Sequence, residues 1–116
     1  MEFKGISRNF STIGNQQYNT IGAFWDEISE RYGRENIRGL GYNWTSTSIE
    51  YVIGWTVGEI DGWNVSISLP EAGWKRVKGR TENLGEIYND IYKEGPLKYE
   101  IEMFKNDGTC VIDFMR

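Results

Sequence analysis

The stretch that decides the fold is TIGAFWDEISERY, residues 20–32. Its large apolar side chains recur every three or four residues, so they share one face of a helix. Gly33 follows at the position where helices commonly end. We therefore predict an amphipathic helix over residues 20–32 that packs on a sheet. Its apolar face consists of Ile21, Phe24, Trp25, Ile28 and Tyr32.

A second stretch of the same kind lies nearer the C-terminus. Its apolar face consists of Leu84, Ile87, Tyr88, Ile91 and Tyr92, and Gly95-Pro96 ends the pattern. Thr81 or Asn83 stands where a side chain could cap the first turn. The segment IYNDI at residues 87–91 resembles FWDEI at residues 24–28. This similarity indicates that one structural unit occurs twice.

Extended segments surround both predicted helices. Residues 63–69 alternate between apolar and polar types, which is typical of a half-buried strand. Asn106-Asp107-Gly108 predicts a hairpin turn, and residues 59–62 predict another turn. Residues 10–17 are polar and are expected to form a loop. Strands are expected at residues 2–8, 39–44, 49–57, 63–69, 74–77, 97–105 and 109–115.

The order strand, helix, strand, strand therefore occurs twice along the chain. We predict an α+β fold with tandem βαββ repeats related by pseudo-two-fold symmetry. Its antiparallel sheet would carry the two helices on one face and a ligand groove on the other. A length of 116 residues fits a single domain over residues 1–116.

The composition excludes several kinds of chemistry. The chain has no histidine and one cysteine, so it can form no Ser-His or Cys-His catalytic pair and no intrachain disulfide. We expect no metal and no cofactor. The lack of disulfides, of a signal peptide and of a long apolar run favours a cytoplasmic protein without a membrane partner. A net charge of −4 argues against direct binding of nucleic acid.

Two glutamates stand out near the C-terminus. Glu100 and Glu102 are two residues apart on one predicted strand, so their side chains point to the same face, about 7 Å apart. Phe104 shares that face. The other face carries Tyr99, Ile101 and Met103. Because this second face is more apolar, we expect it to pack under the helices, and the carboxylates to face away from them.

Aromatic residues are plentiful, with five Trp, seven Tyr and five Phe. These are more rings than two helices and a sheet usually need, so some are expected to line a cavity. The candidate walls are Tyr42, Tyr51, Trp55, Trp74 and Phe104. Tyr51 and Trp55 fit the core between sheet and helices equally well, and Trp25 and Tyr88 are expected in the core. Glu100 also fits a solvated strand face.

Four segments together resemble one known family. Residues 21–25 resemble the start of its first helix, and residues 39–42 with 51–54 resemble its first hairpin. Residues 69–74 resemble its Pro-x-Gly-x-Tyr turn, with Trp74 where tyrosine is usual. Residues 101–107 resemble its Phe-Glu-x-Tyr strand and the turn after it. Along essentially its whole length the chain is thus similar to the GyrI-like small-molecule-binding domain, which is also the effector domain of AraC- and MerR-type multidrug regulators.

The resemblance implies a function and a site. It implies a pocket between the repeats, lined by aromatic rings, with Glu102 as the motif glutamate at its base. The expected partners are cationic, lipophilic, drug-like small molecules. No helix-turn-helix segment is expected before or after the domain, so it would not bind DNA itself; a homodimer and a partner regulator both remain open.

Two other functions stay open at this stage. Some GyrI-like relatives are hydrolases, and Glu100 and Glu102, with Asp113, could activate a water molecule in acid–base hydrolysis. The second is a protein-interaction module of the gyrase-inhibitor kind, whose affinity for a partner protein would not depend on Glu102.

Overall fold

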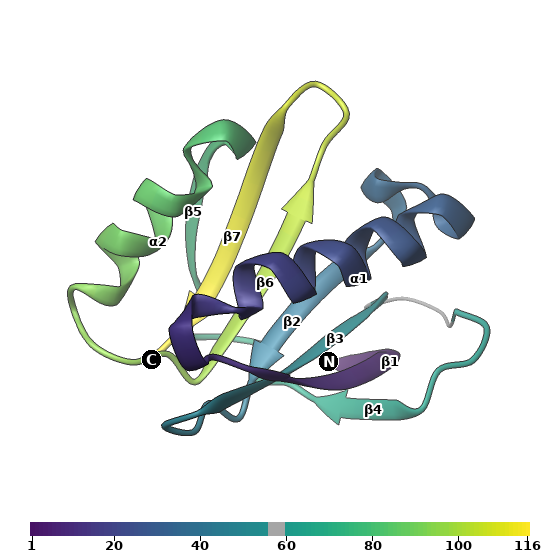
Figure 1. The fold of residues 1–116 in the computed structure, drawn as a ribbon, viewed down its shortest axis with the longest axis horizontal. Helices are drawn as coiled ribbons and strands as arrows, with labels where there is room; N and C mark the ends of the chain where they lie inside the picture. The colour runs from purple at the N-terminus through teal and green to yellow at the C-terminus, as the bar shows by residue number, and fades with distance from the viewer. Residues whose placement is uncertain (56–59) are drawn as a thin grey trace.

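The fold is α+β, with an antiparallel open sheet and two α-helices (Figure 1). The structure is a computed structural model and describes residues 1–55 and 60–116. The strands of this described part are β1 (Glu2–Ser11), β2 (Arg38–Tyr42), β3 (Ser48–Trp55), β4 (Val65–Ser68), β5 (Lys75–Arg80), β6 (Tyr99–Phe104) and β7 (Thr109–Met115). The α-helices are α1 (Gln17–Tyr32) and α2 (Leu84–Tyr92). No helix among these residues is long and apolar enough to cross a membrane.

The sheet has seven strands over the described residues, in the order β4-β1-β3-β2-β6-β7-β5. Each pair of neighbouring strands is antiparallel. Strands β2 and β6 meet at the middle of the sheet, where Gly39 lies opposite Glu102 and Gly41 opposite Glu100. The two halves of the sheet therefore join along a line of glycines and glutamates.

Both helices cover the same face of the sheet, because the strand residues that their buried side chains contact all point to that face. Helix α1 packs Phe24, Trp25 and Ile28 in one cluster with Tyr51 and Ile53 of β3. Helix α2 packs Tyr88 and Ile91 in another cluster with Ile112 and Phe114 of β7. Figure 1 shows α2 beside β5 and α1 in front of β2 and β6, at the middle of the sheet.

The other face of the sheet is buried as well. A third cluster there joins Phe3, Leu40, Val52 and Ile101 to Leu69, from the segment that connects β4 to β5. The connecting residues 69–74 link the two edge strands of the sheet. A flat seven-stranded sheet would separate its edges by about 29 Å, whereas seven Cα steps span at most about 25 Å. The sheet must therefore curl, and the connection crosses behind it.

Several predicted elements are confirmed. The second helix and the last strand have the predicted positions at residues 84–92 and 109–115. Helix α1 begins at Gln17, three residues earlier than predicted, and β1 continues to Ser11 through part of the predicted loop. Val57 and Glu59, which end a predicted strand and begin a predicted turn, lie outside the described residues.

One local prediction is wrong, and the bounds of two strands differ from the predicted ones. Asn83 occupies the N-cap position of α2 but makes no side-chain cap, because residues 81–83 form a 3-10 turn that continues directly into the helix. The predicted strands at residues 63–69 and 74–77 are confirmed with different bounds, as Val65–Ser68 and Lys75–Arg80. The second of these pairs along its whole length with β7, which extends it beyond its apolar pattern.

The predicted orientation of the carboxylates is also wrong. Glu100 and Glu102 lie on the face that carries the helices, and Ile101 lies on the opposite face. The alternation of polar and apolar residues along β6 correctly predicted which of its side chains share a face. It did not show that residues 69–74, rather than the helices, cover the more apolar set.

A core substitution tests the cluster on the second face. Leu40 is fully buried in that cluster, so Leu40→Ala should lower the free energy of unfolding by about 2–5 kcal/mol in urea denaturation. The control Ile13→Ala removes an exposed side chain and should change it by less than about 0.5 kcal/mol. Equal, small effects of both substitutions would contradict a packed core on this face.

Candidate ligand-binding site

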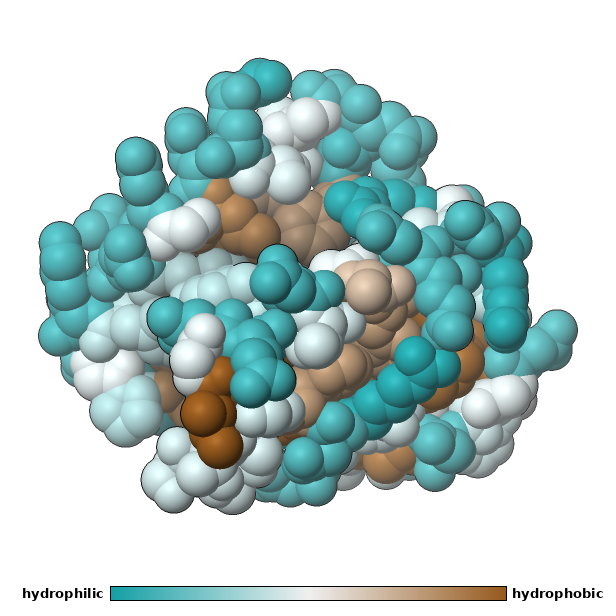
Figure 2. Space-filling view, in the orientation of Figure 1, coloured by the Kyte–Doolittle hydropathy of each residue, from teal (hydrophilic) through white to brown (hydrophobic). Residues whose placement is uncertain are grey.

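A cavity of about 450 Å³ lies between the two helices, above the middle of the sheet. In Figure 2, hydrophobic surface is visible in a hollow between the hydrophilic side chains of this face. The aromatic residues that line the cavity are Tyr18, Trp25, Trp44, Tyr51, Tyr88, Tyr92 and Phe104. Its volume is in the range of pockets that bind small molecules.

The floor of the cavity carries both glutamates of β6. Glu100 is 5% exposed and Glu102 is 7% exposed. The glycines opposite them on β2 provide the room: a Cβ at position 41 would lie 2.8 Å from Glu100 Oε1, and one at position 39 would overlap the Tyr51 hydroxyl. Larger residues at these two positions would thus push the acidic side chains and Tyr51 into the cavity.

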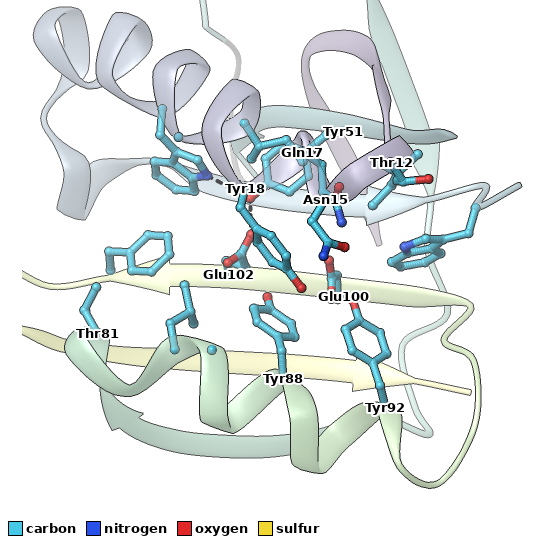
Figure 3. A pocket seen from close by; sticks show the side chains of 18 of the residues that line it. Thr12, Asn15, Gln17, Tyr18, Tyr51, Thr81, Tyr88, Tyr92, Glu100 and Glu102 are labelled. Atoms are coloured by element: carbon cyan, nitrogen blue, oxygen red, sulfur yellow. Dashed lines mark hydrogen bonds between the residues drawn. The ribbon is translucent and has the colours of Figure 1, made fainter. Parts of the chain in front are cut away.

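Aromatic side chains hold both carboxyl groups in place (Figure 3). Trp25 Nε1 donates a hydrogen bond of 2.8 Å to the Tyr51 hydroxyl, which in turn donates to Glu102 Oε1. The Tyr92 hydroxyl donates to Glu100 Oε2 at 3.1 Å. Side chains from α1, β3 and α2 therefore orient the two acidic groups of β6.

Burial changes the acidity of the pair. Loss of hydration, followed by repulsion from Glu102, raises the pKa of Glu100 to about 8, although the hydroxyls of Tyr92 and Tyr88 oppose the rise. Burial also raises the pKa of Glu102, against the stabilising effects of the Tyr51 and Tyr88 hydroxyls and of Arg34. At neutral pH the pair therefore retains a proton that two exposed glutamates would lose.

The tyrosine hydroxyls stay protonated around these groups. Burial first, and the neighbouring glutamates second, raise the pKa values of Tyr51, Tyr88 and Tyr92 above the ordinary value. These phenols consequently act as neutral hydrogen-bonding groups and do not add negative charge to the cavity.

Arg34 is the basic residue that lines the cavity. Its guanidinium lies 5.5 Å from the centroid of the Phe104 ring and 5.7 Å from that of Trp25. It forms an ion pair of 3.2 Å with Asp26. The ion pairs among the described residues all involve acidic groups other than Glu100 and Glu102. Neither buried glutamate thus has a direct cationic partner in this part of the chain.

The cavity brings together four of the residues predicted to bind ligand, namely Glu100, Glu102, Tyr51 and Phe104. The other three lie elsewhere. Tyr42 and Trp74 pack in the cluster on the opposite face of the sheet. Trp55 packs at the edge of the cluster beneath α1 and does not line the cavity.

The strand register and the crossing connection explain these positions. Tyr42 pairs with Tyr99 in the register that places Gly41 opposite Glu100, so it points to the opposite face. The Trp74 ring lies 6.0 Å from the Tyr99 ring on that same face. Asp113, which the hydrolase alternative included, is held there by Arg76 through hydrogen bonds of 2.7 and 2.9 Å.

Sequence reasoning missed several wall residues. Trp25 and Tyr88 pack in the core as expected, but they also line the cavity, where the Tyr88 hydroxyl faces both glutamates. Tyr18, Trp44 and Tyr92 were not predicted to line the cavity. A signal was present, because tyrosines at positions 88 and 92 of an otherwise aliphatic helical stripe carry hydroxyls that a simple core does not need.

Within the described residues, no group of three or more His, Cys, Asp and Glu side chains could hold a metal ion. Comparison with models of protein families, with curated proteins and with solved structures finds no match to this chain. What the cavity binds must be inferred from its residues.

The raised pKa of Glu100 predicts how stability depends on pH. A carboxyl group whose folded-state pKa is above its unfolded value stabilises the fold at low pH, and that stabilisation is lost as the pH rises through the folded pKa. The free energy of unfolding should therefore fall between about pH 5 and pH 8, by up to about 1.4 kcal/mol per pH unit. Glu100→Gln, measured by urea unfolding, should flatten this slope.

The matched control is Glu50→Gln on β3, which replaces a glutamate outside the cavity lining. It should keep the slope of the unchanged protein. If Glu100→Gln and Glu50→Gln have the same slope, Glu100 does not titrate as a buried group.

Proposed function

We propose that this chain is a small-molecule-binding domain that takes a cationic, lipophilic ligand into the cavity between α1 and α2. The observation that carries this proposal is the pair of buried carboxyl groups on the floor of an aromatic cavity, without an ion pair to any described residue. Burying a carboxylate without a partner costs free energy, and a cation that enters the cavity would offset that cost.

The walls suit such a ligand. A cation over the face of an aromatic ring gains about 0.5–2 kcal/mol, more when water is excluded. Trp25, Phe104 and Tyr92 line the cavity together with the two carboxyls, and its volume of about 450 Å³ accepts a drug-sized apolar body. Because flat rings make few directional demands, we expect the domain to bind several ligand shapes.

The architecture is proposed to be that of a GyrI-like domain with two βαββ repeats. The order of elements supports this reading, since β1-α1-β2-β3 is followed, after β4, by β5-α2-β6-β7. The strand order gives further support, because β1-β3-β2 in one half corresponds to β5-β7-β6 in the other, with β2 and β6 adjacent. In that arrangement the cavity lies between the repeats, with Glu102 at its base.

Tryptophan fluorescence tests the proposal, because Trp25 and Trp44 line the cavity. Naphthyl cations should quench saturably, and their neutral analogue 2-naphthylmethanol should bind at least tenfold more weakly. Glu102→Gln should weaken the binding of the cations by about tenfold or more, equivalent to about 1.4 kcal/mol. The alcohol should be affected much less, since it offers no charge to the carboxylate.

Glu50→Gln serves as the control and should leave all affinities unchanged. Equal binding of cations and alcohol would remove the cation from the proposal. A complete lack of binding, by these probes and by larger lipophilic cations, would remove the ligand-binding function.

The affinity for cations should rise with pH. A cation favours the ionised pair, so its binding must displace the proton that Glu100 retains below about pH 8. Among the described residues, the titratable groups that interact with Glu100 are Glu102, Tyr51, Tyr88 and Tyr92, and the phenols stay neutral in this range. With 2-naphthamidine, which keeps its charge, calorimetry should show affinity increasing from about pH 6 to pH 8.

Proton release can be read in the same experiment. The apparent binding enthalpy should differ between buffers of different ionisation enthalpy, and Glu100→Gln should abolish most of that difference. A flat affinity profile with no proton release would show that Glu100 is already ionised before the ligand binds.

A further inference from the structure

The floor of the cavity is rich in hydrogen-bond acceptors, because it carries both glutamates. Each ionised carboxylate can accept about four hydrogen bonds. Among the described residues, hydrogen bonds to the two buried carboxyls come from Tyr92 to Glu100 and from Tyr51 to Glu102. Much of the accepting capacity of the floor is therefore unused.

Two further acceptors in the same cavity are unsatisfied. The Gln17 side-chain oxygen and the Tyr88 hydroxyl are buried without a hydrogen-bond partner in the described part of the chain. Tyr88 is only 6% exposed. Buried polar atoms are nearly always paired in folded proteins, so two such atoms in one cavity call for a specific explanation.

These groups surround one space. Gln17 enters the cavity from the start of α1 and Tyr88 enters it from α2, while Glu100 and Glu102 lie on β6 between the two helices (Figure 3). The Tyr88 hydroxyl faces both carboxyls closely enough to lower the pKa of each, yet it does not reach hydrogen-bonding geometry with either. A ligand group placed among them would meet acceptors from both helices and from the sheet.

We infer that the cavity selects organic cations with several N–H donors, amidinium or guanidinium groups on an apolar body, over quaternary ammonium ions of similar size. This inference rests on the proposed function and specifies its ligand. Planar N–H forks match carboxylates through paired, charge-assisted hydrogen bonds, and their remaining N–H groups can reach Tyr88 and Gln17. A quaternary ammonium ion brings charge but no donor, so these acceptors would stay unpaired.

Among the described residues, no donor makes a hydrogen bond to the Gln17 side-chain oxygen or to the Tyr88 hydroxyl. Arg34 lines the cavity, but its guanidinium is paired with Asp26 and lies over the Phe104 and Trp25 rings. A proton retained by Glu100 supplies a single donor. The mismatch between donors and acceptors therefore remains until a molecule with several N–H groups enters.

Three probes with the same naphthyl body separate charge from donors. They are 2-naphthamidine, 2-naphthylmethylammonium and 2-naphthylmethyl-trimethylammonium, compared by calorimetry at about pH 8. We expect the amidine to bind at least tenfold more tightly than the trimethylammonium ion, with the primary ammonium ion between them. Equal affinities, or tighter binding of the trimethylammonium ion, would overturn the inference.

Two substitutions locate the donors' partners. Tyr88→Phe keeps the ring and removes the hydroxyl, and Gln17→Met keeps the length of the side chain and removes the amide. Each should weaken the binding of the amidine by about three- to tenfold and leave the trimethylammonium ion within about twofold. Tyr42→Phe, which removes a hydroxyl on the opposite face of the sheet, is the control and should change neither affinity.

The outcomes keep the two proposals apart. If all three cations bind equally and Glu102→Gln weakens them all, the cation site stands and the donor selectivity is wrong. If the amidine is preferred but Tyr88→Phe and Gln17→Met leave the preference unchanged, these side chains do not cause it and the inference fails. If no cation binds, or if 2-naphthylmethanol binds as tightly, the proposed function fails and the inference fails with it.

Discussion

The burial of two carboxyl groups side by side on β6 constrains the structure around them. Glu100 and Glu102 are both more than nine-tenths buried, and their repulsion and lost hydration must be offset locally. Glycines on the neighbouring strand leave space for them, and phenols held by both helices supply hydrogen bonds. The phenols serve the acidic pair rather than the packing of a core, since an apolar pair at the same positions would need no hydrogen-bond donors.

Packing on the second face of the sheet allows this arrangement. Because residues 69–74 cross behind the sheet and bury Leu40, Val52 and Ile101 with Leu69, the central strands are held by packing on the side away from the helices. The cluster beneath α1 extends to Phe104 of β6 and Cys110 of β7, whereas the cluster beneath α2 is centred on Ile112 and Phe114 of β7. The space between the helices can remain open, because the middle strands do not depend on helix contacts alone for their burial.

Much of the fold, and part of the site, could be predicted from the sequence. The helical stripes and the final hairpin depend on local patterns, and the shared face of Glu100 and Glu102 follows from the two-residue period of a strand. Which element covers each face is not a local property. A connection distant in the sequence buries Tyr99 and Ile101. The same connection places Trp74 on the face of the sheet opposite the cavity. Tyr88 and Tyr92 were visible as polar-tipped members of an apolar stripe, but their meeting with the glutamates depends on how α2 lies across β6.

The proposed cation binding would be linked to fold stability through the same proton. Without a ligand, the buried pair is least destabilising when Glu100 retains its proton. Repulsion within the pair therefore destabilises the fold most at alkaline pH. A cation bound as proposed would replace that proton and relieve the repulsion, and its stabilising effect would grow with the ratio of free ligand to Kd. The ligand is therefore expected to stabilise the protein most where the empty protein is least stable. A cavity with an ordinary aliphatic floor would show no such reciprocity, because neither its stability nor its affinity would depend on the ionisation of a group inside it.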